Sequence, residues 1–202
     1  MTASPEPRQE KIWDIGTRLF HWCLVIAFTT SFLMGEFGPN IMTIHFWSGY
    51  VIIGLVVFRL IWGVVGPRPA RFSSFVRGPG AVLAYARHAG QRRPSYWPGH
   101  NPLGALSVIA LLALLAAQVT TGLLADPEDY VNVGPLAHMV DSATNRKASV
   151  WHERIAYTLL ALVAIHIAVI LFYRFWKRED LIGPMIHGRK WVVRKDGEDR
   201  GQ

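Results

Sequence analysis

The chain has a single cysteine, Cys23, among its 202 residues. One thiol excludes an intramolecular disulfide, an iron–sulfur cluster held by four cysteines of this chain, and a cofactor attached through a C-x-x-C-H motif. Charge is also scarce, because Asp, Glu, Lys and Arg make up only 17% of the residues, against about 25% in an ordinary soluble domain. The composition therefore excludes disulfide scaffolds and disordered tail proteins.

Hydrophobic residues make up 51% of the chain, and many of them gather in four long runs. The runs cover about residues 17–34, 43–65, 103–124 and 150–175. A helix needs about 20 mostly apolar residues to cross roughly 30 Å of hydrocarbon, so each run predicts a transmembrane helix. We expect an all-α integral membrane protein, with a four-helix bundle over residues 17–176 between an N-terminal segment, 1–16, and a C-terminal tail, 177–202.

Basic residues are distributed unevenly between the predicted loops. Lys and Arg number three in residues 1–18, six in 66–102 and eight from Arg174 onward, but none in 35–42 and two in 125–149. Because basic loops stay on the cytoplasmic side, we expect both termini in the cytoplasm and the protein in a bacterial inner membrane. The same asymmetry accounts for the net charge of +7, so no nucleic-acid partner is expected. Residues 82–90 predict a short helix on the anionic lipid leaflet.

Four of the eight histidines lie inside the apolar runs. Ionisable residues within a bilayer are rare and costly, which makes each one a candidate functional residue. For any single histidine, a hydrogen bond across a helix interface is an equally good explanation. These four are His21, His45, His152 and His166.

Their positions pair them at two membrane depths. His152 and His166 are 14 residues apart on one helix, which is about 3.9 turns and about 21 Å along the axis, so both project from nearly the same face. The predicted topology puts His45 level with His152 near the outer side. It puts His21 level with His166 near the inner side.

Two facing imidazoles at one depth suit the axial ligation of a haem iron between helices of a bundle. Zinc is a poorer match, because two ligands at each level fall short of four. A proton relay could also use membrane histidines, but it does not require level pairs. Arg18 and Arg59 are candidate partners for haem propionates, although Arg18 also suits an interfacial anchor and Arg59 could extend to the inner interface.

Several stretches together resemble the bacterial cytochrome b561 family, in particular the branch that includes the b-type cytochrome subunit of nickel–iron hydrogenases. The similarity covers about residues 12–191, and it rests on WDIGTRLFHWCLV, IHFWSGYVIIGLVVFRLIWGVVGPRPARFSSFVRGP, GHNPLGALSV, the helix bracketed by WHE and AIH, and DLIGPMIHGRKW. The resemblance implies two non-covalent b haems on the four histidines, and electron exchange with the membrane quinone pool.

Three polar residues at the expected inner membrane face are candidate contacts for the quinone or a propionate: His100, Asn101 and Arg71. A helix-capping turn with a solvated histidine is the alternative, since polar loop residues are usually just solvated. At the outer face, the acidic residues of loop 125–149 suit a basic periplasmic partner such as a small c-type cytochrome. A subunit of a redox enzyme is another candidate partner.

We therefore expect an electron-transfer protein, a di-haem b-type membrane cytochrome that links a periplasmic partner to quinone. One alternative is a partner-free oxidase of a small periplasmic substrate, such as superoxide, that reduces quinone. The other is a haem-free, proton-coupled membrane carrier in which the histidines form a relay.

Overall fold

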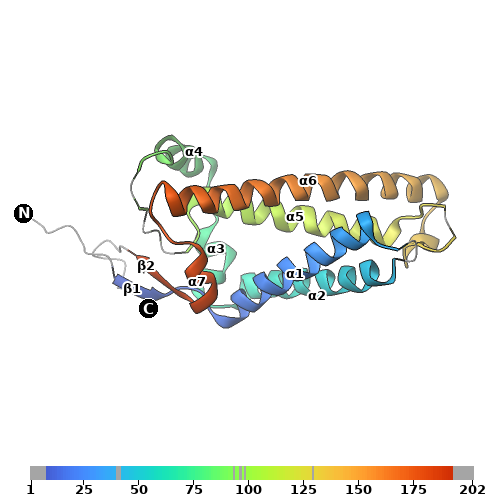
Figure 1. The fold of residues 1–202 in the computed structure, drawn as a ribbon, viewed down its shortest axis with the longest axis horizontal. Coiled ribbons are helices and arrows are strands. Elements are labelled where there is room, and N and C mark those ends of the chain that lie inside the picture. The colour runs from blue at the N-terminus through green and yellow to red at the C-terminus, as the bar shows by residue number, and fades with distance from the viewer. Residues whose placement is uncertain are drawn as a thin grey trace, which may run out of the picture. The chain divides into compact units, whose positions relative to one another are not determined.

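The computed structural model describes residues 8–39, 42–92, 94–95, 97, 99–128 and 130–192. Its four long helices are α1 (Ile15–Phe37), α2 (Thr43–Val65), α5 (Pro102–Leu124) and α6 (Ser142–Phe175), as Figure 1 shows. All four are long and apolar enough to cross a membrane, as predicted. The short helices are η1 (Arg68–Ala70), α3 (Phe72–Phe75), α4 (Pro79–His88), η2 (Ala137–Met139) and α7 (Ile182–His187), and the strands are β1 (Arg8–Lys11) and β2 (Arg189–Val192).

The chain forms two compact units. The bundle unit comprises Phe20–Leu60 and Val108–Ile165, and so contains a part of each long helix. The terminal unit comprises Met1–Leu19, Ile61–Ser107 and His166–Gln202.

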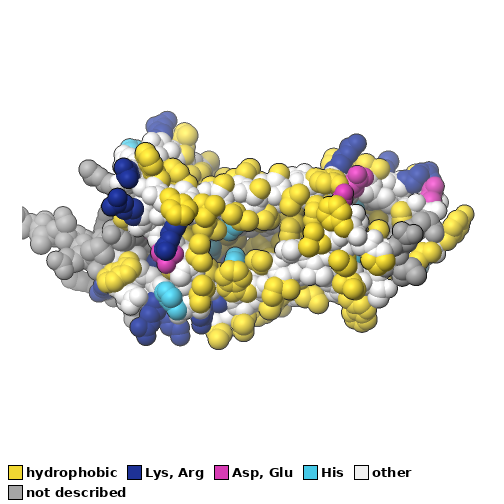
Figure 2. All heavy atoms as spheres, viewed as in Figure 1, with side chains coloured by type: hydrophobic (Ala, Val, Ile, Leu, Met, Phe, Trp, Pro, Cys, Tyr) yellow, Lys and Arg dark blue, Asp and Glu magenta, His cyan; other side chains and the backbone are white. Residues whose placement is uncertain are grey.

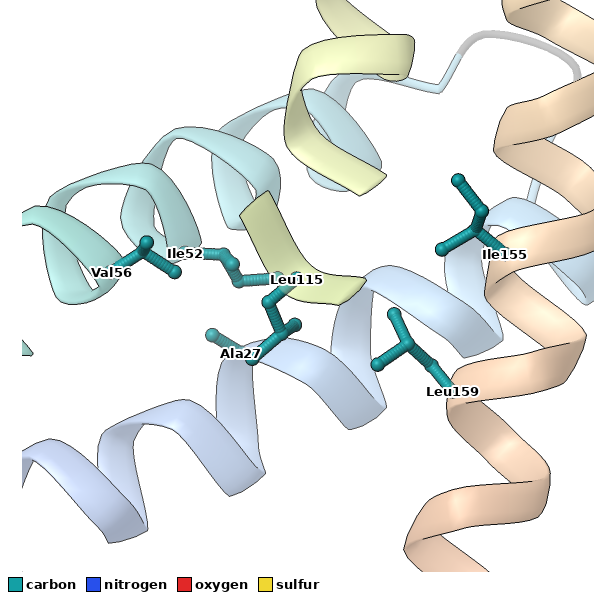
Figure 3. Packing of buried hydrophobic residues seen from close by; sticks show 6 residues of the cluster. All are labelled: Ala27, Ile52, Val56, Leu115, Ile155 and Leu159. Carbon is teal, nitrogen blue, oxygen red and sulfur yellow. The ribbon is translucent and has the colours of Figure 1, made fainter. Parts of the chain in front are cut away.

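One apolar cluster joins all four helices of the bundle unit. Its buried members, shown in Figure 3, are Ala27 of α1, Ile52 and Val56 of α2, Leu115 of α5, and Ile155 and Leu159 of α6. Close van der Waals packing of these side chains helps to hold the helix segments together.

The outward faces of the long helices are apolar as well. Ile26 is 66% exposed and Val64 is 70% exposed, and Figure 2 shows hydrophobic side chains along these helices. Apolar patches of this extent are rare on soluble proteins but are what the hydrocarbon of a bilayer requires.

Helix α6 begins at Ser142, eight residues before the expected start at 150. Residues 142–149 are mostly polar, so hydropathy did not mark them as helical. Asp141 explains the early start, because its carboxylate accepts hydrogen bonds from the backbone N–H groups of Ala143 and Thr144 and from the Thr144 hydroxyl. The Thr144 bonds hold the pKa of Asp141 below its usual value, as expected for a helix N-cap carboxylate.

The two ends of the described chain pair with each other in the terminal unit. Strands β1 and β2 are antiparallel, with Arg8 opposite Val192 and Lys11 opposite Arg189. Ile12, Trp13 and Val192 form a small core beside them. The sequence analysis did not predict this sheet; it agrees with an even number of spans, which brings both ends to one side. Residues 193–202 of the expected tail lie outside the described residues.

The predicted surface helix is present as α4. The Lys177 ammonium donates to the carbonyls of Ala89 and Gln91, at 3.1 and 3.3 Å, just beyond the last turn of α4. A cation at this end is favoured by the helix dipole. The Tyr85 and Tyr173 hydroxyls, 2.8 Å apart, form a second link to α6.

A buried ion pair ties β2 to the end of α6. Lys190 Nζ lies 3.1 Å from Glu179 Oε1, and both side chains are under 10% exposed. The backbone N–H and hydroxyl of Ser95 donate to Glu179 Oε2. Burial opposes ionisation of Glu179, but the Lys190 charge and the Ser95 bonds outweigh it, so the pKa of Glu179 is lowered.

This pair predicts an acid-sensitive contribution to stability. A carboxyl whose pKa falls on folding stabilises the fold above its unfolded pKa, and this is lost as the pH falls through the folded value. The wild type should lose stability below about pH 4.5, the ordinary value for Glu179, and Glu179→Gln should flatten that dependence. The measurement is the unfolding midpoint of each protein at pH 7 and in acid. The control is Glu128→Gln, which removes the carboxylate of an exposed ion pair with Arg146. If the unfolding midpoint depended on pH equally in Glu179→Gln and Glu128→Gln, the assignment would be wrong.

Candidate functional site

The bundle unit contains a cavity of about 320 Å³ between its four helix segments. The walls are mostly apolar and include Phe28, Phe32, Ile52 and Leu115. Ile52 and Leu115 also belong to the core cluster, so the packing that holds the helices together also shapes the cavity.

Two of the predicted histidines face each other across this cavity. His45 comes from the first turn of α2 and His152 from α6, and both line the wall. Their ring centroids are 5.9 Å apart and the ring planes are nearly perpendicular, at 80°. The structure thus brings together the two residues that the sequence analysis paired by depth alone.

Each imidazole is oriented by the backbone of a neighbouring helix. Nδ1 of His45 lies 2.8 Å from the carbonyl oxygen of Ser31 on α1, and Nδ1 of His152 lies 3.0 Å from the carbonyl oxygen of Gln118 on α5. A carbonyl only accepts hydrogen bonds, so each Nδ1 carries the proton and each Nε2 keeps its lone pair. An outer hydrogen bond of this kind is the usual support of a metal-binding histidine.

A glycine makes each of these bonds accessible. Gly35 and Gly122 lie four residues after Ser31 and Gln118, on the helix surface beside the carbonyl that the imidazole reaches. A Cβ atom at Gly35 would lie 2.9 Å from His45 Nδ1, and one at Gly122 would lie 2.7 Å from His152 Cε1. Any larger residue would therefore displace the ring.

The amide of Gln118 also meets the second ring nitrogen. Its Nε2 lies 3.2 Å from Nε2 of His152, and the Thr121 hydroxyl lies 3.4 Å from Nδ1. With Nδ1 protonated, the amide donates to the Nε2 lone pair, which is the lone pair that a metal would take.

The donor set fits an axially ligated macrocycle better than a closed metal site. No group of three or more His, Cys, Asp or Glu side chains that could hold a metal ion occurs in the described part of the chain. Two neutral imidazoles on facing helices, in an apolar cavity, can bind a haem iron from both sides. The residues present therefore fit a haem.

Acidic rather than basic residues line this cavity. Glu36 and Glu153 are among the lining side chains, and no Lys or Arg is. The Tyr157 hydroxyl donates to Glu36 Oε2 at 2.9 Å. Neither of the predicted propionate partners, Arg18 and Arg59, belongs to this cavity.

The second predicted pair is divided between the units. His21 belongs to the bundle unit, where its ring meets Trp22 edge to face at 5.1 Å, while His166 belongs to the terminal unit and is half-buried. Arg59 lies in the bundle unit and is only 2% exposed. Their pairing stays a prediction.

The predicted contacts at the inner face have local partners in the terminal unit. The His100 ring lies between those of Trp13 and Phe75, with both centroids 4.7 Å away. Asn101 caps α5 through the Gly104 N–H and donates to the Tyr173 hydroxyl.

The two arginines of this unit that were predicted as ligand contacts donate to backbone carbonyls. Arg71 Nε donates to the Gly66 carbonyl, and Arg18 donates to the Ile186 carbonyl. These bonds support the local structure. A role in binding a ligand stays a prediction for both side chains.

The sequence analysis missed the residues that support the histidines. It did not single out Ser31 or Gly35. A signal was available, because SFLMG and QVTTG both place a polar residue four positions before a glycine in an apolar helix.

Comparison with known proteins agrees with this geometry. Residues 12–188 match the family described as prokaryotic cytochrome b561. Among curated proteins, the chain is 21% identical to the "Probable Ni/Fe-hydrogenase 1 B-type cytochrome subunit" of Escherichia coli (strain K12), over 88% of each chain. It is 24% identical to the "Probable Ni/Fe-hydrogenase B-type cytochrome subunit" of Rhizobium leguminosarum bv. viciae, over 93% of this chain and 90% of the relative. No solved structure gives a significant match.

The chain therefore belongs to the prokaryotic cytochrome b561 family. It is an integral membrane b-type cytochrome, and its prosthetic group is b-type haem. The resemblance recognised in the sequence is confirmed. The match favours neither the superoxide oxidase nor the haem-free carrier.

The two glycines provide a sharp test of the cavity as a haem site. Gly35→Ala and Gly122→Ala should each displace one imidazole and reduce haem content by about one haem per chain, as counted by a pyridine haemochrome assay. Gly54→Ala is the matched control, because a Cβ there would meet nothing within 4 Å. Full haem content in both cavity variants would show that the rings do not bind haem in this arrangement.

Proposed function

We propose that this protein is a di-haem cytochrome that carries electrons between a membrane-bound redox enzyme and the quinone pool. His45 and His152 bind one haem b, and His21 and His166 bind the other. The observation that carries the proposal is a pair of imidazoles with ring centroids 5.9 Å apart in an apolar cavity, with both Nδ1 atoms bonded to helix carbonyls.

When bound, a haem iron supplies one-electron transfer between its ferric and ferrous states. The chain's own residues bind and orient it. Ser31 and Gln118 hold the imidazoles in the tautomer that can ligate, and Phe28, Phe32 and Leu115 exclude water from the cavity. Two histidine ligands leave no open position for oxygen, which favours electron transfer over ligand activation.

The 14-residue spacing of His152 and His166 supports the second haem. It corresponds to about 21 Å along one straight helix on a single face, which suits two centres at successive membrane depths. Arg59 of α2, which is only 2% exposed, is the proposed partner of the propionates of this second haem, because a guanidinium forms charge-assisted hydrogen bonds with carboxylates.

The partner is proposed from the relatives' names. Both relatives are named as B-type cytochrome subunits of Ni/Fe-hydrogenases, so the redox enzyme proposed here is a hydrogenase bound at the His45/His152 side. A periplasmic c-type cytochrome is the other candidate from charge. The excess of Lys and Arg in the terminal unit supports a cytoplasmic location for both termini, in the inner membrane.

The haem ligands can be tested one pair at a time. The purified wild type should contain two b haems, and His152→Ala and His21→Ala should each remove a different one. The two variants should show different residual α-bands in reduced-minus-oxidised spectra. His138→Ala, outside the four long helices, is the control. Unchanged spectra in either ligand variant would exclude that residue as a ligand.

Quinone exchange is proposed at His100, Asn101 and Arg71. Quinol added to the protein in nanodiscs should reduce its haems, and His100→Ala should slow this at least tenfold while dithionite still reduces them fully. His88→Ala, on exposed α4, controls for loss of an imidazole. Equal quinol rates in both variants would place the quinone elsewhere.

A further inference from the structure

A second cavity, of about 470 Å³, lies in the terminal unit at the end of α6. It is formed by Gln9 of β1, by the residues that follow α6, by α7 and by β2, and most of its lining side chains are polar. Four basic side chains contribute to it: Arg178, His187, Arg189 and Lys190. Figure 2 shows the Lys, Arg and His side chains that gather over this region.

The acidic residues of this cavity are already paired. Glu179 is bound by Lys190 and by Ser95. Asp180 pairs with Arg174 at 3.3 Å and accepts the backbone N–H groups of Ile182 and Gly183. Neither carboxylate is therefore available to neutralise another cation.

The two guanidinium groups of this cavity, those of Arg178 and Arg189, have no carboxylate partner among the described residues. Both line the cavity. His187 adds a third donor, because its Nδ1 accepts the backbone N–H of Arg189 and leaves Nε2 to carry the proton in the neutral ring.

The backbone at Arg178 supports a binding role. Its φ of 54° lies in the left-handed region, where residues other than glycine are strained. Such strain is retained where the surrounding structure holds it and is concentrated at ligand sites. Here Lys177 and Glu179, the residues before and after Arg178, are both buried and hold this backbone conformation.

We propose that this cavity binds a phosphate-bearing anion. The planar guanidinium fork matches phosphate oxygens in a bidentate manner, which gives charge-assisted hydrogen bonds. The anion has two sources, the headgroup of an anionic phospholipid and free phosphate. Beside the site, Trp191 is 56% exposed and Ile186 is 63% exposed. These side chains give the acyl chains of such a phospholipid an apolar surface.

The test uses the full-length, haem-loaded protein. Wild type in nanodiscs with phosphatidylglycerol should retain this lipid in native mass spectra and should unfold at a higher temperature than in phosphatidylcholine alone. Arg178→Gln and Arg189→Gln should each weaken binding about tenfold, the loss expected for one charge-assisted bond. Arg189→Lys should lose less, because it keeps the charge.

Arg68→Gln is the matched control, since it removes one exposed arginine of the same unit outside the cavity. To distinguish the two sources of the anion, the unfolding midpoint is also measured in inorganic phosphate and compared with that in chloride at the same ionic strength. Stabilisation by phosphatidylglycerol alone identifies a lipid headgroup, and stabilisation by phosphate identifies the free ion. In either case the haem spectrum should not change.

The proposal is overturned if neither probe stabilises the wild type. It is also overturned if a variant that combines Arg178→Gln with Arg189→Gln responds to both probes as Arg68→Gln does. Unfolding midpoints in phosphatidylcholine establish beforehand that each variant is folded. The lysine variants at both positions provide the same comparison if a glutamine variant does not fold.

Discussion

The hydrogen bond between a histidine Nδ1 and a helix carbonyl is the interaction on which the candidate site depends. It occurs twice, at Ser31 and at Gln118. A helix carbonyl already accepts one intrahelical bond, and its second lone pair takes the imidazole. This is possible only because glycine stands four residues later. The constraint therefore extends from the backbone of α1 and α5 to the tautomer of the histidines on α2 and α6, and from there to the Nε2 lone pairs that are proposed to bind iron.

The core cluster and the cavity are two parts of one packing arrangement. Aliphatic side chains of the four helices pack against one another in the core cluster. Ile52 and Leu115 belong to this cluster and also line the cavity, so they lie at the boundary between the two. Because lipid offers no hydrophobic drive for helices to associate, contact among them depends on close packing and hydrogen bonds. A haem bound by His45 and His152, as proposed, would stabilise the folded bundle, because a ligand that binds the folded state stabilises it.

Hydropathy and charge predicted the four helices, and helix periodicity with topology predicted that His45 and His152 would meet. Both signals are local, or follow from counting turns. The early start of α6 was missed because Asp141 and a polar first turn carry no hydropathy signal. The β1–β2 pairing was missed because it joins segments almost a full chain apart. The support of His45 by Ser31 was missed because periodicity gives the depth of a residue but not its neighbour.

The two cavity histidines lie at different distances from the ends of their own helices. The helix has 34 residues, or about 51 Å, against roughly 30 Å of hydrocarbon, and it begins ten residues before His152. By contrast, His45 is the third residue of α2, only eight residues after the end of α1. His45 therefore lies in the first turn of α2, whereas His152 lies almost three turns inside α6. Less of its own helix separates the His45 imidazole from a helix end than separates that of His152.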